Sequence, residues 1–288
     1  MPIVVLLMAS TLWGLTWMPL KFLHGQGIEA LLLLTVSCGI VSVLSVPVLW
    51  WQRSACRGQW GVLALVALLG GFASFAFNYA LMYGDVIRVM VLFYLVPVWS
   101  ALGGRLVLGE PIDLQRMISV GLALAGVFLI LGGWHILASP LSWIDVLALA
   151  SGFAFAMNNV VFRATPRAPL ISKLMVMFWG CALIGGVLLL AGLETIPVVS
   201  GMNWMWIALM GGGWYLLAAS SSQWAVTKLQ AGQAGVIMVM ELIAAVASAA
   251  LLGESDMTLL KSAGVLCVMA ASVLEAWRPA EASAPVAA

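Results

Sequence analysis

Two stretches of the chain, half its length apart, resemble each other and decide the fold. Residues 79–111 read YALMYGDVIRVMVLFYLVPVWSALGGRLVLGEP, and residues 224–255 read WAVTKLQAGQAGVIMVMELIAAVASAALLGES. Both are apolar runs that end in Leu-Gly-Glu, and the closing residues Glu110 and Glu254 lie 144 positions apart. Pro97 and Glu241 each lie 13 residues before the closing Glu. The chain therefore contains an internal repeat whose period is half its length.

The composition is that of a membrane protein with little mass outside the bilayer. Of the 288 residues, 64% are hydrophobic and 8% are charged, and the mean hydropathy is +1.13. A soluble domain has about 25% charged residues, so the composition excludes a water-soluble globular protein and a disordered chain. A net charge of +1 without a basic block gives no electrostatic reason for a nucleic-acid partner. The four cysteines have no metal-binding or redox spacing, and we interpret them as small apolar fillers.

The charged residues and the Pro/Gly clusters divide the chain into apolar runs of membrane-spanning length. A transmembrane helix needs about 20 predominantly apolar residues. We therefore expect an all-α polytopic membrane protein with ten transmembrane helices. The predicted spans are 3–22, 29–51, 60–83, 87–108, 115–133, 142–162, 172–192, 203–224, 230–252 and 259–277.

The distribution of Lys and Arg predicts the orientation in the membrane, because cytoplasmic connections are enriched in these residues. With the N-terminus in the cytoplasm, three of them fall on the outer side: Lys21, Arg88 and Lys261. The other nine fall on the inner side: Arg53, Arg57, Arg105, Arg116, Arg163, Arg167, Lys173, Lys228 and Arg278. This bias predicts that both termini are cytoplasmic.

The repeat and the spans together predict two inverted halves. Each half holds five predicted spans, an odd number, so the second half must insert upside down relative to the first. We expect a first five-helix repeat over 3–133, a second and inverted repeat over 142–277, and a short disordered tail over 278–288. Inverted repeats are typical of alternating-access transporters, whose substrate site lies near the bilayer midplane between the halves.

Two five-helix halves, each closing with a run of small residues and Leu-Gly-Glu, resemble the drug/metabolite transporter superfamily and its EamA-type repeats. The resemblance covers residues 3–277. Within it, LWGLTW at 12–17, the Tyr79/Tyr83 pair and MEL at 240–242 are most similar to the bacterial aromatic amino acid exporters of the YddG type. The resemblance implies a carrier in the bacterial inner membrane, without a cofactor, that exports aromatic amino acids or similar small amphipathic metabolites. The alternative is a multidrug, organic-cation or other metabolite carrier of the same superfamily.

Glu241 is the outstanding polar residue of the predicted spans, because twelve uncharged residues precede it and twelve follow it. An unpaired carboxylate at that depth costs about 2.5–3.5 kcal/mol on insertion scales. One interpretation is a functional group that pairs with a substrate amine or carries a proton. The other is a structural carboxyl that joins helices at the position where the first repeat has Pro97.

The candidate substrate-binding residues are aromatic and polar groups that repeat symmetry brings toward one central cavity. They are Trp17, Asn78, Tyr79, Tyr83, Trp99, Asn158, Trp214, Tyr215 and Glu241. An aromatic substrate would stack on Trp and Tyr, worth about 0.5–1.5 kcal/mol per pair, while amides and phenols would meet a zwitterionic backbone. The alternative for each Trp or Asn is ordinary helix packing, in which Asn and Gln form hydrogen bonds between helices.

Other classes of membrane protein find less support in the sequence. Both histidines, His24 and His135, lie at span ends, and all four Asp lie in or beside loops, so neither a proteolytic pair nor a metal site is expected. We therefore expect no enzymatic activity. Every Lys and Arg lies near a span end, which disfavours an anionic substrate. A channel is the remaining alternative, and the inverted repeat favours a carrier over it.

Overall fold

A computed structural model describes residues 1–83, 86–130, 142–192, 200–252 and 258–277, and these residues form helices and connections without a strand. The predicted tail at 278–288 lies outside the described residues. In chain order the helices are α1 (Pro2–Gly14), α2 (Trp17–Gly25), α3 (Ala30–Trp51), α4 (Trp60–Tyr83), α5 (Val86–Phe93), α6 (Val96–Leu108), α7 (Leu114–Ile130), α8 (Trp143–Ala164), α9 (Leu170–Leu190), α10 (Gly201–Leu209), the π-helix η2 (Met210–Tyr215), α11 (Leu216–Val226), α12 (Ala231–Met238), α13 (Met240–Leu251) and α14 (Leu259–Ala276).

These helices are those of a polytopic membrane protein. In the described part of the chain, seven helical stretches are long and apolar enough to cross a membrane, and α6 and α7 are shorter apolar helices. Six of the predicted spans each correspond to one helix, namely α3, α4, α7, α8, α9 and α14, and the other four correspond to interrupted helices. The count of ten crossings and the cytoplasmic position of the termini stay predictions.

Two of the interruptions fall at equivalent positions of the repeat. One separates α5 from α6 at Tyr94 and Leu95, and the other separates α12 from α13 at Val239. Leu95 and Val239 are 144 residues apart, the period of the sequence repeat. Pro97 explains the first interruption, because proline has no backbone N–H and lies at the start of α6. The second interruption contains no proline and puts Glu241 in the first turn of α13, where the helix dipole favours a negative charge.

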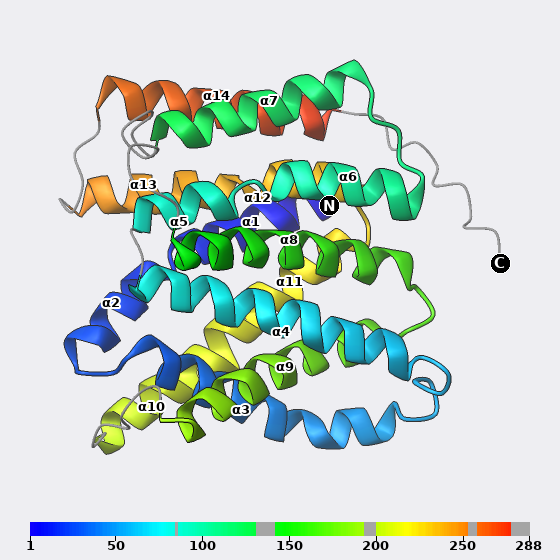
Figure 1. The fold of residues 1–288 in the computed structure, drawn as a ribbon, viewed down its shortest axis with the longest axis vertical. Coiled ribbons are helices and arrows are strands. Elements are labelled where there is room, and N and C mark those ends of the chain that lie inside the picture. Colours follow the sequence, from blue (N-terminus) through cyan, green and yellow to red (C-terminus); the bar gives the residue numbers. More distant parts are fainter. Residues whose placement is uncertain (84–85, 131–141, 193–199, 253–257, 278–288) are drawn as a thin grey trace.

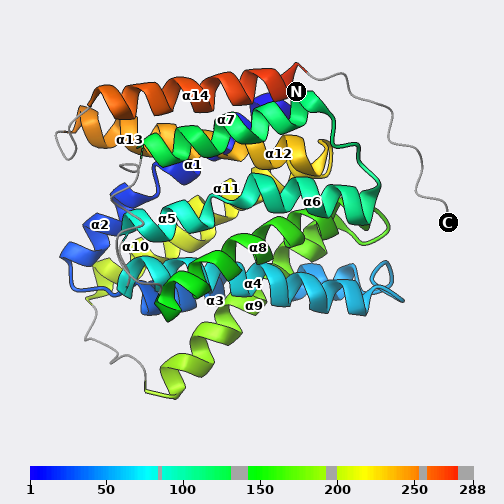
Figure 2. The same cartoon turned by 45° about the horizontal axis from the view of Figure 1, so that its top comes forward.

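The helices form two outer groups with a central group of helices between them. The pair α7 and α14 packs along one side, and α3, α4 and α9 pack together at the other. Helices α1, α6, α8, α12 and α13 lie between these two sides (Figure 1, Figure 2). The half-helices α6, α12 and α13, which flank the interruptions at Leu95 and Val239, therefore lie between the two outer groups.

Glycines bring the backbones of packed helices into close approach. A Cβ atom on Gly180 of α9 would collide with the carbonyl of Ala67 on α4, and one on Gly71 would collide with the backbone of Gly180. At the crossing of α7 and α14, a Cβ on Gly126 would lie 2.7 Å from the carbonyl oxygen of Gly264. Helix association in a bilayer relies on such van der Waals packing, because lipid supplies no hydrophobic driving force between helices.

The close approach at Gly180 is testable with a single methyl group. Overpacking a tight contact costs about 1–3 kcal/mol, so Gly180→Ala is expected to lower the free energy of unfolding in detergent by at least that much. Gly186→Ala on the same helix is the matched control, because a Cβ there meets no atom within 4 Å. Thermal unfolding followed by tryptophan fluorescence checks both variants. Equal midpoints would contradict the packing described for α4 and α9.

Candidate functional site

A cavity with a volume of about 200 Å³ lies among the helices of both predicted halves. Its lining comes from α1, α2, α3, α4, α5 and their connections, and from α8, α9, η2, α11, α12 and α13. Helices α7 and α14 contribute none of its lining residues. The interrupted helices therefore surround the cavity, while the pair α7 and α14 supports it from outside.

Aromatic side chains form much of the wall. They are Trp13, Trp17, Phe77, Phe93, Tyr94, Phe155, Phe178 and Tyr215. The polar groups are hydroxyls and amides, including Ser10, Thr16, Ser74, Asn78, Ser222 and Gln223. Among the described lining side chains, Glu241 is the one with a carboxyl group, and no Lys, Arg or His is found there. The cavity therefore suits a molecule with a large apolar part and a positive or neutral polar group.

Glu241 and Tyr94 join the two helix interruptions. The phenol of Tyr94 donates a hydrogen bond of 2.6 Å to Oε1 of Glu241. Tyr94 lies between α5 and α6, and Glu241 lies in the first turn of α13, so the contact connects the equivalent positions of the two halves. Gly14 of α1 packs directly on the backbone at Glu241, where a Cβ would collide with its carbonyl oxygen. The carboxylate is therefore fixed in the wall by three helices.

The indole groups of the first span are also fixed by hydrogen bonds to the second half. Nε1 of Trp13 donates to Oγ of Ser222 at 3.1 Å, and Nε1 of Trp17 donates to Oγ of Ser248 at 3.0 Å. The ring of Trp13 lies 5.9 Å from that of Tyr215, centroid to centroid. The indole N–H groups of Trp13 and Trp17 are therefore satisfied, and both residues line the cavity.

Four of the nine predicted site residues line the cavity, namely Trp17, Asn78, Tyr215 and Glu241. Trp214 lies behind the wall, where its Nε1 donates to Oγ1 of Thr16 at 2.9 Å.

Three other predicted residues, whose side chains the structure describes, are not among the lining residues. Tyr79 packs against Phe75 and Trp143, and Trp99 packs edge-on against Phe153. Asn158 is buried beside Met177. The side chain of Tyr83 lies outside the described ones.

Sequence reasoning missed Tyr94, although the structure pairs it with Glu241. A signal was present, because Tyr94 precedes Pro97 by one helical turn and a proline at the start of α6 forces the helix to restart. The residues that flank a helix restart in a membrane protein are typical positions for a binding site. Phe77 and Phe93 carry no comparable signal, because a phenylalanine in an apolar span is indistinguishable from packing residues.

Comparisons with known proteins agree with this architecture. Residues 1–132 match the EamA-like transporter family, which supports a membrane transporter of the drug/metabolite kind. A solved structure titled "Crystal structure of protein" has a TM-score of 0.75 and 16% sequence identity, with 95% of each chain covered. At that identity the likeness shows the fold alone. No curated protein matches the chain.

Because of the cavity, we expect a chemical reagent to reach one of two asparagine positions and not the other. Asn78 lines the cavity and is half-buried, whereas Asn158 is fully buried and is not among the lining residues. In Asn78→Cys, a small thiol-reactive maleimide is expected to modify residue 78 rapidly. In Asn158→Cys, residue 158 is expected to remain unmodified in the folded protein. Peptide mass spectrometry separates each site from the native cysteines, and protection of both positions would contradict a solvent-accessible cavity.

Proposed function

We propose that the protein is an alternating-access carrier that exports aromatic amino acids or similar small amphipathic metabolites across the bacterial inner membrane. The observation that carries the proposal is the cavity between the predicted halves, with its aromatic wall and the Tyr94–Glu241 pair. An aromatic side chain in the cavity would stack on indole and phenol rings. The substrate ammonium would meet Glu241, and the amide of Asn78 would serve its carboxylate as a donor.

Symmetric helix packing supports the division into two inverted halves, 3–133 and 142–277. The packed pairs are preserved when the halves are exchanged: α4 with α8 becomes α11 with α1, and α6 with α8 becomes α13 with α1. The pairs α3 with α9 and α7 with α14 are exchanged into themselves. The equivalent interruptions at Leu95 and Val239 follow the same relation. Such an arrangement allows the same rocking motion to open either side.

A second candidate function is the transport of organic cations. The charge on the described cavity lining favours it, because a carboxylate is present and no cationic side chain is found among those residues. Aromatic ring faces also attract cations. An organic cation and an aromatic amino acid share the positive group and the apolar body, and they differ in the substrate carboxylate.

Uptake into proteoliposomes distinguishes the two substrates. Labelled phenylalanine or tryptophan is expected to show saturable uptake that other aromatic amino acids inhibit and glutamate or a sugar phosphate does not. An imposed pH gradient tests coupling to protons, and protein-free liposomes provide the background. If a quaternary aromatic ammonium ion is transported and the amino acids are not, the second function replaces the first. Failure of both substrates would remove the proposed substrate class.

Glu241→Gln is expected to reduce uptake of an amine substrate about tenfold or more, because hydrogen bonds to charged groups contribute about 1.5–3 kcal/mol. Tyr94→Phe removes a donor to Glu241 and leaves the carboxylate, so a smaller effect is expected. Glu29→Gln, at the start of α3 and outside the cavity lining, is the matched control. Initial uptake rates at several pH values check all three variants. If Glu241→Gln retains wild-type uptake and pH dependence, Glu241 is a structural carboxyl.

A further inference from the structure

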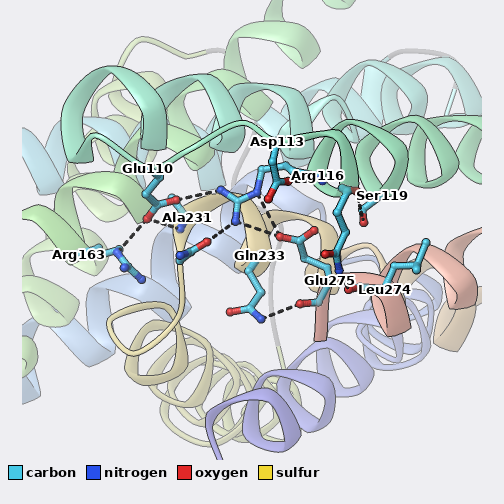
Figure 3. A network of polar contacts seen from close by, with 11 residues as sticks. Glu110, Asp113, Arg116, Ser119, Arg163, Ala231, Gln233, Leu274 and Glu275 are labelled. Atoms are coloured by element: carbon cyan, nitrogen blue, oxygen red, sulfur yellow. Dashed lines mark hydrogen bonds and ion pairs between the residues drawn. The ribbon is translucent and has the colours of Figure 1, made fainter. Parts of the chain in front are cut away.

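A cluster of charged side chains is buried at one end of the bundle, where α6, α8 and α14 end and α7 and α12 begin (Figure 3). We name it the Arg116 cluster; its members are Glu110, Arg116, Arg163, Gln230 and Glu275. Arg116 and Glu275 have no exposed side-chain surface, and Glu110 is 5% exposed. Charged groups are almost never buried to this degree unless they are paired.

The contacts of the cluster balance its charges. Nη1 of Arg116 donates to Oε2 of Glu110 at 3.2 Å, and its Nη2 donates to Oε1 of Glu275 at 3.0 Å. The same Nη2 also donates to the side-chain oxygen of Gln230. Nε of Arg163 lies 3.1 Å from Oε1 of Glu110. Two guanidinium groups and two carboxylates thus form one neutral unit.

The cluster joins the two predicted halves through the start of α12. Glu110 and Arg116 belong to the first half, and the other members belong to the second. The backbone N–H of Ala231 donates to Oε1 of Glu110 at 3.0 Å, and Nε2 of Gln233 donates to the carbonyl of Glu275 at 2.8 Å. Figure 3 shows both contacts beside the guanidinium of Arg116. The first turn of α12 is therefore held by a carboxylate from the other predicted half and by a backbone carbonyl of α14.

Two glycines provide the space that this arrangement needs. A Cβ on Gly104 of α6 would lie 2.7 Å from Oε2 of Glu110, and a Cβ on Gly232 of α12 would lie 2.7 Å from Nη1 of Arg116. Larger residues at these positions would displace the ion pair. The backbones of α6 and α12 are therefore packed directly against the charged groups.

The same two helices connect the cluster to the cavity. Helix α6 begins beside Tyr94, and α12 ends at Met238, which lines the cavity together with Glu241. Between these points the helices pack closely, since a Cβ on Gly235 would lie 2.7 Å from Cβ and Oγ of Ser100. Every residue of α12 is buried. Helix α12 therefore offers no solvent-exposed surface between the cavity and the cluster.

The cavity extends from near the end of α11 toward the end of the bundle opposite the cluster. Its lining residues on α4 come from the later part of the helix, including Ser74 and Asn78, while α4 begins at the end that holds the cluster. Trp17 and Leu20, which lie in the span part away from the cluster, are half-buried. The buried Arg116 cluster and the buried helix α12 therefore close the end of the bundle at which they lie.

We propose that the Arg116 cluster is a latch that closes this end of the carrier and must separate when the cavity opens toward it. The inference rests on the alternating access in the proposed function. An ion cluster suits the role because burial of its charges is costly, and water that enters the opened end would hydrate them again. Apolar contacts lack this compensation, because opening would expose their surface to water.

A reporter cysteine at Ser100 tests the latch without any substrate. Ser100 is 1% exposed and lies between the cluster and the cavity. In detergent, Arg163→Gln is expected to accelerate maleimide modification of the cysteine in Ser100→Cys about fivefold. The reason is that the loss of one partly exposed ion pair shifts the equilibrium from the closed toward the open state by about this factor. Arg116→Lys, which keeps the charge and loses the planar fork of donors, is expected to accelerate it further. Peptide mass spectrometry measures the rate at each site.

Two controls separate a latch from general loosening. Native Cys56 is 1% exposed, lies beside α4 and α9 at the same end, and hydrogen-bonds to Ser172 outside the cluster. Its modification rate is expected to remain unchanged in every variant. Arg167→Gln removes an exposed charge near the end of α8 and is expected to leave residue 100 protected. Unchanged rates at residue 100 in both cluster variants, or equal acceleration at Cys56, would overturn the latch. These readouts are independent of the uptake measurements that test the substrate class.

Discussion

Backbone groups that a broken helix leaves unpaired cannot face lipid, because the bilayer core offers no water to bind them. This constraint places the interruptions at Leu95 and Val239 inside the helix bundle. Once buried, they bring Tyr94 and Glu241 into contact and leave space between the half-helices, which is the cavity. The close glycine contacts of the outer helices follow from the same need to enclose these segments. The site is thus a consequence of where the helices are allowed to break.

The apolar runs and the repeat predict most of the architecture, because both can be recognised from the order of residues along the chain. Pro97 marks the first helix interruption directly. The equivalent interruption at Val239 contains no proline or glycine, so only the repeat, and not its own residues, indicates it. The division into inverted halves and the transport function stay proposals that the packing and the family match over residues 1–132 support.

The candidate site was harder to predict, since helical periodicity groups residues on a face without showing what that face contacts. Tyr79 and Asn78 are neighbours in sequence, yet only Asn78 lines the cavity, while Tyr79 packs against Trp143. The Arg116 cluster shows the same limit for charges. The distribution of Lys and Arg assigns Arg116 and Arg163 to the inner side of the membrane, but it does not indicate their partners. Glu110 and Glu275 come from segments 165 residues apart and meet the arginines only once the chain is folded.

The absence of cavity-lining residues from α7 and α14 has an evolutionary consequence. The paired glycines of these helices constrain their own crossing, while the residues that line the cavity belong to other helices. A substitution in the cavity wall therefore leaves this supporting pair intact. The wall residues can therefore change without disturbing the crossing of α7 and α14, whereas these two helices can change only where their glycines permit.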